Sequence, residues 1–154
     1  MKITFLGTGT SQGVPVIACD CDVCISQNHK DKRLRSSVMI EIENNIFVID
    51  TGPDFRQQML RERVTKLDAI LYTHAHKDHV AGLDDIRSFN FRSKKEMDIF
   101  CSKDVLQALK NEFSYIFSGV RYPGVPKVNT SVINNTPFLI NKIKIVPIQA
   151  LHYK

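Results

Sequence analysis

Four candidate metal ligands lie within six residues of this sequence, and they constrain the fold more than any other feature. The segment His74-Ala75-His76-Lys77-Asp78-His79 directly follows a strand-like apolar run. Side chains two residues apart on an extended chain share a side, so His74 and His76 can point together, and the next turn can bring Asp78 and His79 to the same cavity. Imidazole and carboxylate together suit zinc, manganese or iron. Because the chain has five histidines in all, three in one window indicate a site for two cations rather than a polar surface loop.

Hydrophobic periodicity predicts a mixed α/β (α+β) fold without repeats or linkers. Val38, Ile40 and Ile42 alternate with Met39, Glu41 and Glu43, the period of a half-buried strand. Asn44-Asn45 then offers the positive-φ residues that a tight hairpin needs. Ser102 can cap a helix whose apolar residues form one stripe. The predicted strands are residues 2–6, 38–42, 46–49, 68–73, 99–101, 128–133, 138–140 and 143–148; the predicted helices are a short one after Pro53, one at 82–91, and one carrying Val105, Leu109, Phe113 and Ile116.

Residues 7–35 show no periodicity, and a stretch of that length needs something to organise it. Cys19, Cys21 and Cys24 lie inside it, and tetrahedral zinc bound by thiolates would hold a loop at about residues 15–30 together. His29 could complete a Cys3His site, and a distant ligand or water is the alternative. Three unpaired buried thiols would be the non-metal interpretation. Cys101 lies in a strand-like run and is expected to be a small buried hydrophobic residue.

Composition is that of a soluble globular protein, with 43% hydrophobic and 24% charged residues. No apolar run reaches the roughly 18 residues of a membrane span, and the N-terminal apolar stretch is too short for a signal peptide, so we expect a cytoplasmic protein without membrane contact. The formal net charge is +5. That charge fits either ordinary solvated faces or the attraction of a phosphate-bearing substrate.

The histidine segment resembles the signature of the metallo-β-lactamase superfamily. Gly7-Thr8-Gly9 after the first strand is similar to the opening of that superfamily's phosphodiesterase and tRNA-processing branches. The cysteine pattern that follows resembles the cyclic-phosphate branch, whose familiar member is the phosphoribosyl cyclic phosphate phosphodiesterase. The resemblance implies that residues 1–154 are the N-terminal half of an αβ/βα sandwich, an incomplete domain whose remaining ligands, an Asp and a further His, lie beyond Lys154. Such a half would expose an apolar sheet face and be unstable, aggregated or paired with a partner.

The resemblance also implies roles for single residues. His74, His76 and His152 would hold one divalent metal, while Asp78 and His79, the catalytic ligands, hold a second, either metal being zinc or manganese. Asp50, at the end of residues 46–49, would support these ligands from behind. Cys19, Cys21 and Cys24 would bind one structural zinc, whose fourth ligand in the family is a histidine near the C-terminus of the full domain.

The function implied is a metal-dependent hydrolase, in which a metal-bridging hydroxide attacks a small cyclic phosphate or nucleotide-like phosphodiester. A tRNA 3′-end endonuclease is the alternative enzyme, although no long arm for tRNA is visible in the sequence. A non-catalytic zinc module that binds RNA, or an inactive fragment, is the alternative of another class. The expected partner is a small phosphodiester, with nucleic acid as the second choice and a homodimer as a possibility.

Overall fold

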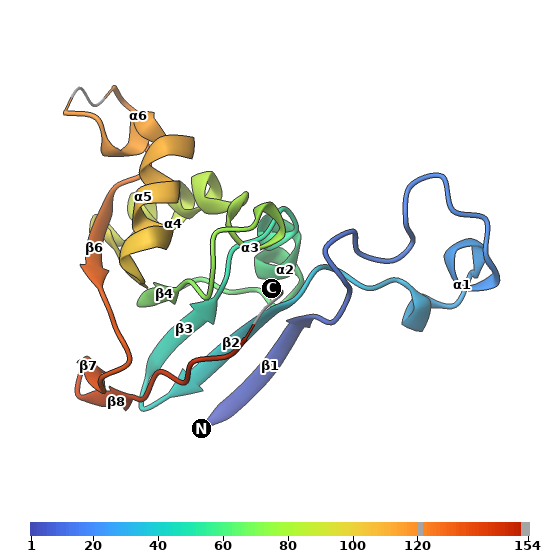
Figure 1. The fold of residues 1–154 in the computed structure, drawn as a ribbon, viewed down its shortest axis with the longest axis horizontal. Helices are drawn as coiled ribbons and strands as arrows, with labels where there is room; N and C mark the ends of the chain where they lie inside the picture. Colours follow the sequence, from blue (N-terminus) through green and yellow to red (C-terminus); the bar gives the residue numbers. More distant parts are fainter. Residues whose placement is uncertain (120–121, 152–154) are drawn as a thin grey trace.

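The computed structural model describes residues 1–119 and 122–151. Its main element is a six-stranded sheet in which the strands follow their order in the sequence (Figure 1). The first three strands pair antiparallel, and the third to the sixth pair parallel. The strands are β1 (Lys2–Gly7), β2 (Ser37–Ile42), β3 (Asn45–Ile49), β4 (Ala69–Leu71), β5 (Met97–Cys101) and β6 (Val128–Val132).

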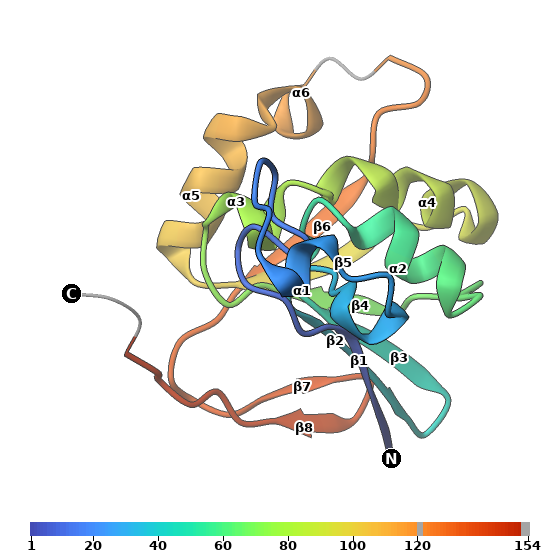
Figure 2. The same ribbon diagram turned by 90° about the vertical axis from the view of Figure 1, so that its right-hand side faces the viewer.

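Helices cover one face of this sheet, as Figure 2 shows. The main core lies between the two layers, with Val48, Ile70 and Ile99 from the sheet against Leu83 and Leu109 from the helical layer, all fully buried. The elements of this layer are α2 (Phe55–Arg61), α3 (Lys77–Val80), the 3-10 helix η2 (Leu83–Ile86), α4 (Arg87–Ser93), α5 (Lys103–Glu112) and α6 (Ser114–Phe117).

The helix predicted from Ser102 is present, and its cap is confirmed. The Ser102 hydroxyl accepts a hydrogen bond from the backbone N–H of Val105 at 3.3 Å. The predicted stripe from Val105 to Ile116 is buried, but the helix does not run through it: α5 ends at Glu112, and α6 carries Ile116. The backbone of Phe113 leaves the helical region with φ −108° and ψ 44°, and the break between the two helices lies there.

A small hairpin of β7 (Phe138–Ile140) and β8 (Ile143–Ile145) covers part of the opposite face of the sheet. Phe47 and Ala69 from the sheet pack against Ile140 and Ile143 in a second, smaller core. The strand predicted at residues 143–148 begins at Ile143 as expected but ends at Ile145, three residues before its predicted end. Elsewhere on the chain large apolar side chains remain exposed, including Ile3 at 50% and Phe5 at 68% on the edge strand β1.

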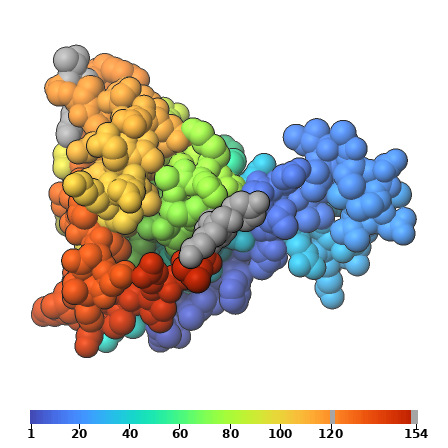
Figure 3. All heavy atoms as spheres, viewed as in Figure 1, coloured from blue at the N-terminus to red at the C-terminus, as the bar shows by residue number. Residues whose placement is uncertain are grey.

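Residues 8–36 form a lobe that projects away from the sheet between β1 and β2 (Figures 1 and 3). It contains two short helices that the sequence did not predict, α1 (Asp22–Ile25) and the 3-10 helix η1 (His29–Asp31). In the lobe before its stem, the buried residues are Gly9, Gly13 and Cys24, so the lobe has almost no hydrophobic core of its own. We refer to residues 8–36 as the cysteine lobe.

The stem of the cysteine lobe is fastened to the first residues of α2. Asp54 accepts hydrogen bonds from the backbone N–H of Arg35 at 2.8 Å and from its guanidinium at 3.0 Å. Gln58 in turn donates to the carbonyl oxygen of Arg35 at 2.9 Å. Among the described residues, no helix has the length and apolar character needed to cross a membrane.

Candidate metal centre

The histidine segment and Asp50 meet because β3 and β4 are parallel neighbours. Ile49 pairs with Leu71, so the carboxyl ends of both strands lie at one edge of the sheet. The backbone N–H of Asp50 donates to the carbonyl oxygen of Leu71 at 2.9 Å. The chain after β4 then runs through His74 and His76 into α3, whose first turn carries Asp78 and His79.

The four candidate ligands lie as two pairs. The Nε2 atom of His74 is 3.1 Å from Nδ1 of His76, and Nε2 of His79 is 3.2 Å from a carboxylate oxygen of Asp78. The pairs are adjacent, because the ring centroids of His74 and His79 are 4.0 Å apart. Among the described residues, no three of these four ligands bring their donor atoms within 4.8 Å of one another. The three cysteines of the lobe do. Within residues 1–119 and 122–151, the arrangement is therefore two neighbouring sites to which the chain brings two donors each.

Asp50 contacts His79 directly and His74 through Thr73, and these contacts determine which ring nitrogen of each histidine carries a proton. Its carboxylate can only accept, so Nδ1 of His79, 2.7 Å away, must be the donor of that hydrogen bond. The hydroxyl of Thr73 donates to the same carboxylate oxygen at 2.7 Å and so can only accept from Nδ1 of His74, at 2.9 Å. Both histidines consequently have an unprotonated Nε2 when they are neutral, as metal binding requires.

The Asp50 carboxylate is itself held in a closed environment. Asp50 is 3% exposed and takes a left-handed backbone conformation with φ 63°, which Asp tolerates better than most residues. The backbone N–H of Thr73 donates to its second oxygen at 2.8 Å. The hydroxyl of Ser37 on β2 donates to the carbonyl oxygens of Ile49 and Asp50.

The Asp50–His79 hydrogen bond raises the pKa of His79 above its ordinary value, and this effect outweighs the opposing effect of burial. The negative charges of Asp50 and Asp78 act in the same direction. The surroundings of His79 therefore favour a positive charge at this ring. In the metal-free chain a second ring proton supplies that charge.

Two glycines hold the loop after β3 directly against α3. A Cβ atom on Gly52 would lie 2.1 Å from the carbonyl oxygen of Asp78, and one on Gly82 would lie 2.3 Å from the carbonyl oxygen of Gly52. Backbone hydrogen bonds reinforce this contact, from Thr51 to the His79 carbonyl and from Gly82 to the Thr51 carbonyl, each at 2.8 Å. Thr73, Gly52 and Gly82 were not predicted from the sequence. The position of Thr73 beside His74 was a usable signal for the first, but no local pattern indicates the glycine contacts.

The three cysteines of the lobe form a second candidate centre. All three sulfur atoms lie within 4.8 Å of one another, with Cys24 buried and Cys19 and Cys21 exposed. The backbone N–H of Cys24 is the main cause that lowers the pKa of Cys21, and a lowered pKa favours the thiolate that zinc binds. His29 does not join this group, so the local Cys3His arrangement is absent from the described structure. Cys101 is completely buried, as expected.

The remaining predicted ligand, His152, lies outside the described residues. Lys77, inside the histidine segment, forms an ion pair with Glu112 of α5. Its positive charge excludes it as a metal ligand.

Residues 45–154 match the family model described as the β-lactamase superfamily domain. The crystal structure of a new diphosphatase from the PhnP family superposes with a TM-score of 0.86 at 40% identity, over 95% of this chain and 55% of that one. The Zn(2+)-bound PqqB structure from Methylobacterium extorquens gives a TM-score of 0.69 at 22% identity, over 90% of this chain and 48% of that one, a likeness of fold alone.

Two curated relatives have different names. An octanoyltransferase of Porphyromonas gingivalis is 37% identical over 99% of this chain and 31% of its own length. A ribonuclease Z of Methanococcus maripaludis is 28% identical over 80% of this chain and 36% of its own length. The chain thus spans about a third of these two relatives and about half of the structures above.

Proposed function

Since the chain belongs to the β-lactamase superfamily, we propose that it forms the metal-binding part of a metal-dependent phosphodiesterase. The fold predicted from its sequence, the N-terminal half of a metallo-β-lactamase-type sandwich, is confirmed by its similarity to the PhnP-family diphosphatase. The observation that carries the proposal is the pair of adjacent two-donor sites with Asp50 behind them.

The donor set fits two divalent cations, zinc or manganese. His74 and His76 would hold one, together with His152 by the family resemblance, and Asp78 and His79 would hold the other. Two cations in these positions would supply an activated water and neutralise charge on phosphoryl oxygens. The chain's own contribution is orientation: Asp50 holds Nδ1 of His79 protonated directly, and Nδ1 of His74 through Thr73, so that both Nε2 atoms stay available.

A small phosphodiester is the substrate class that we favour. The PhnP-family protein at 40% identity is a diphosphatase, and ribonuclease Z acts on RNA, so both related names refer to phosphate linkages. The cysteine lobe, with its three converging sulfur atoms, favours the small-substrate branch over the alternative, a tRNA 3′-end endonuclease. The lobe would bind one structural zinc, which would replace the core that it lacks.

The alternative of another class, a non-catalytic zinc module, rests on the cysteine cluster alone. Metal stoichiometry separates the two, because the enzyme requires metal at the histidine pairs and the module does not. Zinc bound to the cysteines and nowhere else would favour the module.

The decisive experiment measures metal content and hydrolysis of bis(4-nitrophenyl) phosphate in wild type and three variants. In the completed domain we expect about three metal ions per molecule, two at the histidine pairs and one in the cysteine lobe. His76→Ala and Asp78→Ala should each lose histidine-site metal and hydrolysis while keeping the lobe zinc. His29→Ala, an exposed histidine outside both clusters, is the matched control and should change neither quantity. Hydrolysis that survives complete chelation would contradict the proposal.

A further inference from the structure

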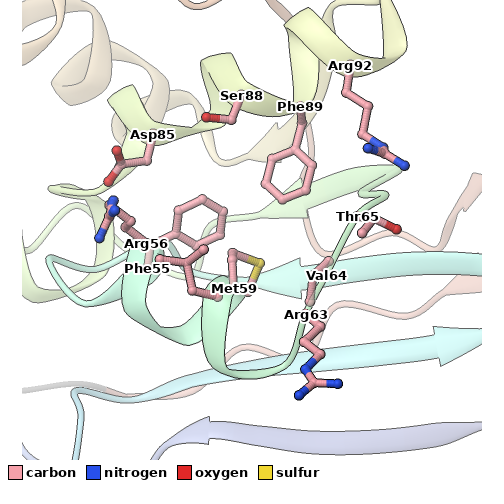
Figure 4. Close-up of a pocket in the computed structure, with 11 residues that line it drawn as sticks. Phe55, Arg56, Met59, Arg63, Val64, Thr65, Asp85, Ser88, Phe89 and Arg92 are labelled. Carbon is pink, nitrogen blue, oxygen red and sulfur yellow. The ribbon is translucent and has the colours of Figure 1, made fainter.

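A groove on the helical side of the molecule lies between α2 and α4 and shares no residue with the candidate metal centre (Figure 4). Its volume is about 510 Å³, within the size range of small-molecule sites. The floor is apolar, formed by Phe55 and Met59 from α2 and Phe89 from α4. The rings of Phe55 and Phe89 lie next to each other at a centroid distance of 6.3 Å.

The two ends of the groove differ in charge. At one end the carboxylate of Asp85 lies opposite the guanidinium of Arg56, and at the other Arg92 lies near Thr65, as Figure 4 shows. Arg63 lines the same groove. A smaller hollow of about 240 Å³ continues past Thr65 and Arg92. Lys66 also lines that hollow, but its ammonium group pairs with Asp68 at 3.0 Å and donates to the Asn44 carbonyl at 2.7 Å, so the basic character of this end comes from Arg92.

The charged side chains that line the groove have no intramolecular partner that would explain their presence. Within residues 1–119 and 122–151, the side chains of Asp85, Arg56, Arg63 and Arg92 make neither hydrogen bonds nor ion pairs. By contrast, Asp84, the residue before Asp85, forms an ion pair with Arg87 and accepts a hydrogen bond from Tyr115. Asp85 and Arg92 therefore remain available to a ligand.

We propose that this groove is a binding site for a nucleoside monophosphate. The phosphate would lie at the basic end, where a guanidinium matches its geometry in a bidentate fashion. The planar base would lie over the apolar floor and against Leu60, which lines the groove and is 61% exposed, because a flat ring buries apolar area there at little entropic cost. An amino group of the base would donate to Asp85 at the far end. Ser88, on the wall between the two ends, is placed to contact the ribose hydroxyls.

The site is independent of catalysis at the metal centre, so its failure and that of the proposed function are distinguishable. Phe55 connects the two regions only structurally: its backbone N–H donates to the Gly52 carbonyl at 3.0 Å. A nucleotide that binds at the histidine pairs instead would do so through metal and would be lost in His76→Ala.

The test is a calorimetric titration of the chain with AMP, adenosine and inorganic phosphate, in the His76→Ala background and in the presence of a chelator. We expect AMP to bind at least about tenfold more tightly than either fragment, because both ends of the groove contribute. Arg92→Gln should weaken AMP binding by about tenfold or more, since it removes the charge-assisted phosphate contact. Arg33→Gln makes the same charge change at an exposed position in the cysteine lobe and should leave AMP binding unchanged.

A second variant tests the location without relying on charge. Ser88→Trp places a large side chain at an exposed position of α4 on the wall of the groove, and should block AMP while the circular dichroism spectrum stays native. The proposal is overturned by an absence of AMP binding at millimolar concentration, or by AMP affinity no greater than that for phosphate. Equal weakening by Arg92→Gln and Arg33→Gln would also overturn it, because that result would indicate non-specific attraction to net charge.

Discussion

Replacement of Asp50 by asparagine should uncouple the two histidines from their metals while leaving the backbone in place. Asparagine tolerates the left-handed conformation that Asp50 takes with φ 63°, so the substitution adds little strain. The amide keeps one acceptor oxygen but gains an N–H group. When that group faces His79 it donates to Nδ1 and moves the ring proton to Nε2, the atom 3.2 Å from Asp78. The Nε2 lone pair that a metal needs is then blocked.

The magnitude follows from the contacts that change. The carboxylate of Asp50 accepts three hydrogen bonds between 2.7 and 2.8 Å, from the Thr73 N–H, the Thr73 hydroxyl and His79. Loss of a group that orients a metal-binding histidine lowers metal affinity by about 10–100-fold, equivalent to about 1.4–2.7 kcal/mol. The metal-free protein should also lose stability, by about 1.5–3 kcal/mol for the hydrogen bonds to the charged group.

Competition with a chromophoric chelator measures the affinity, and Asp68→Asn is the matched control. Asp68 also lies beside a strand, and it accepts a backbone hydrogen bond from Ile46 at 2.8 Å and pairs with Lys66. The control should therefore reduce stability without changing affinity at the histidine pairs. Unchanged zinc affinity in Asp50→Asn, with the loss of stability alone, would refute the orientation argument.

Proton binding by His79 gives an independent measurement in the metal-free chain. Its hydrogen bond to Asp50 raises the pKa of His79, so this pair stabilises the fold below about pH 6.5, the unfolded value, and the contribution disappears as pH rises through the higher folded pKa. In an NMR titration the pKa of His79 should fall in Asp50→Asn. A pKa that does not move would show that Asp50 is not its cause.

Three further predictions concern other parts of the chain. Gly52→Ala should cost about 1–3 kcal/mol and expel metal from the histidine pairs, because its Cβ atom would overlap the Asp78 carbonyl; Gly119→Ala, which meets open space, should be neutral in the same thermal melts and metal assays. Cys24→Ser should remove one zinc per chain by elemental analysis and make the cysteine lobe sensitive to limited proteolysis, and a variant that keeps its full zinc content would exclude a zinc site there. Phe5→Lys should reduce self-association of the chain in light scattering, since Phe5 is 68% exposed on an edge strand; an unchanged or already monomeric state would exclude the apolar β1 surface as its cause.

The sequence predicted the elements well where side-chain periodicity determines them. The alternation at residues 38–42 became β2, and the stripe from Val105 to Ile116 is buried as expected. Periodicity failed where backbone detail or pairing decides the outcome. The helix predicted at residues 82–91 begins as a 3-10 turn at Leu83–Ile86, and the α-helix runs from Arg87 to Ser93. The strand predicted to end at residue 148 ends at Ile145, because pairing with β7 extends no further.

In the cysteine lobe, the absence of periodicity was informative about the core but not about the local helices. Its lack of periodicity correctly indicated that no hydrophobic core organises it, and the spacing of Cys19, Cys21 and Cys24 was enough to expect them together. The two short helices in the lobe carry no apolar stripe, and for that reason they could not be predicted. The sequence left the fourth ligand open between His29 and a distant group, and in the described structure His29 does not join the three sulfur atoms.

The amino-acid sequence by itself determined which ligands the candidate metal centre can offer, because His74 to His79 are adjacent in the chain and follow a strand whose buried character is a local property. The tertiary structure decided how those ligands are divided and prepared. Asp50 comes from a different strand, and only the parallel pairing of β3 with β4 brings its carboxylate to Thr73 and His79. A hydrogen bond depends on positions in space to within a fraction of an ångström, and residues more than 20 apart acquire such positions only when the sheet forms.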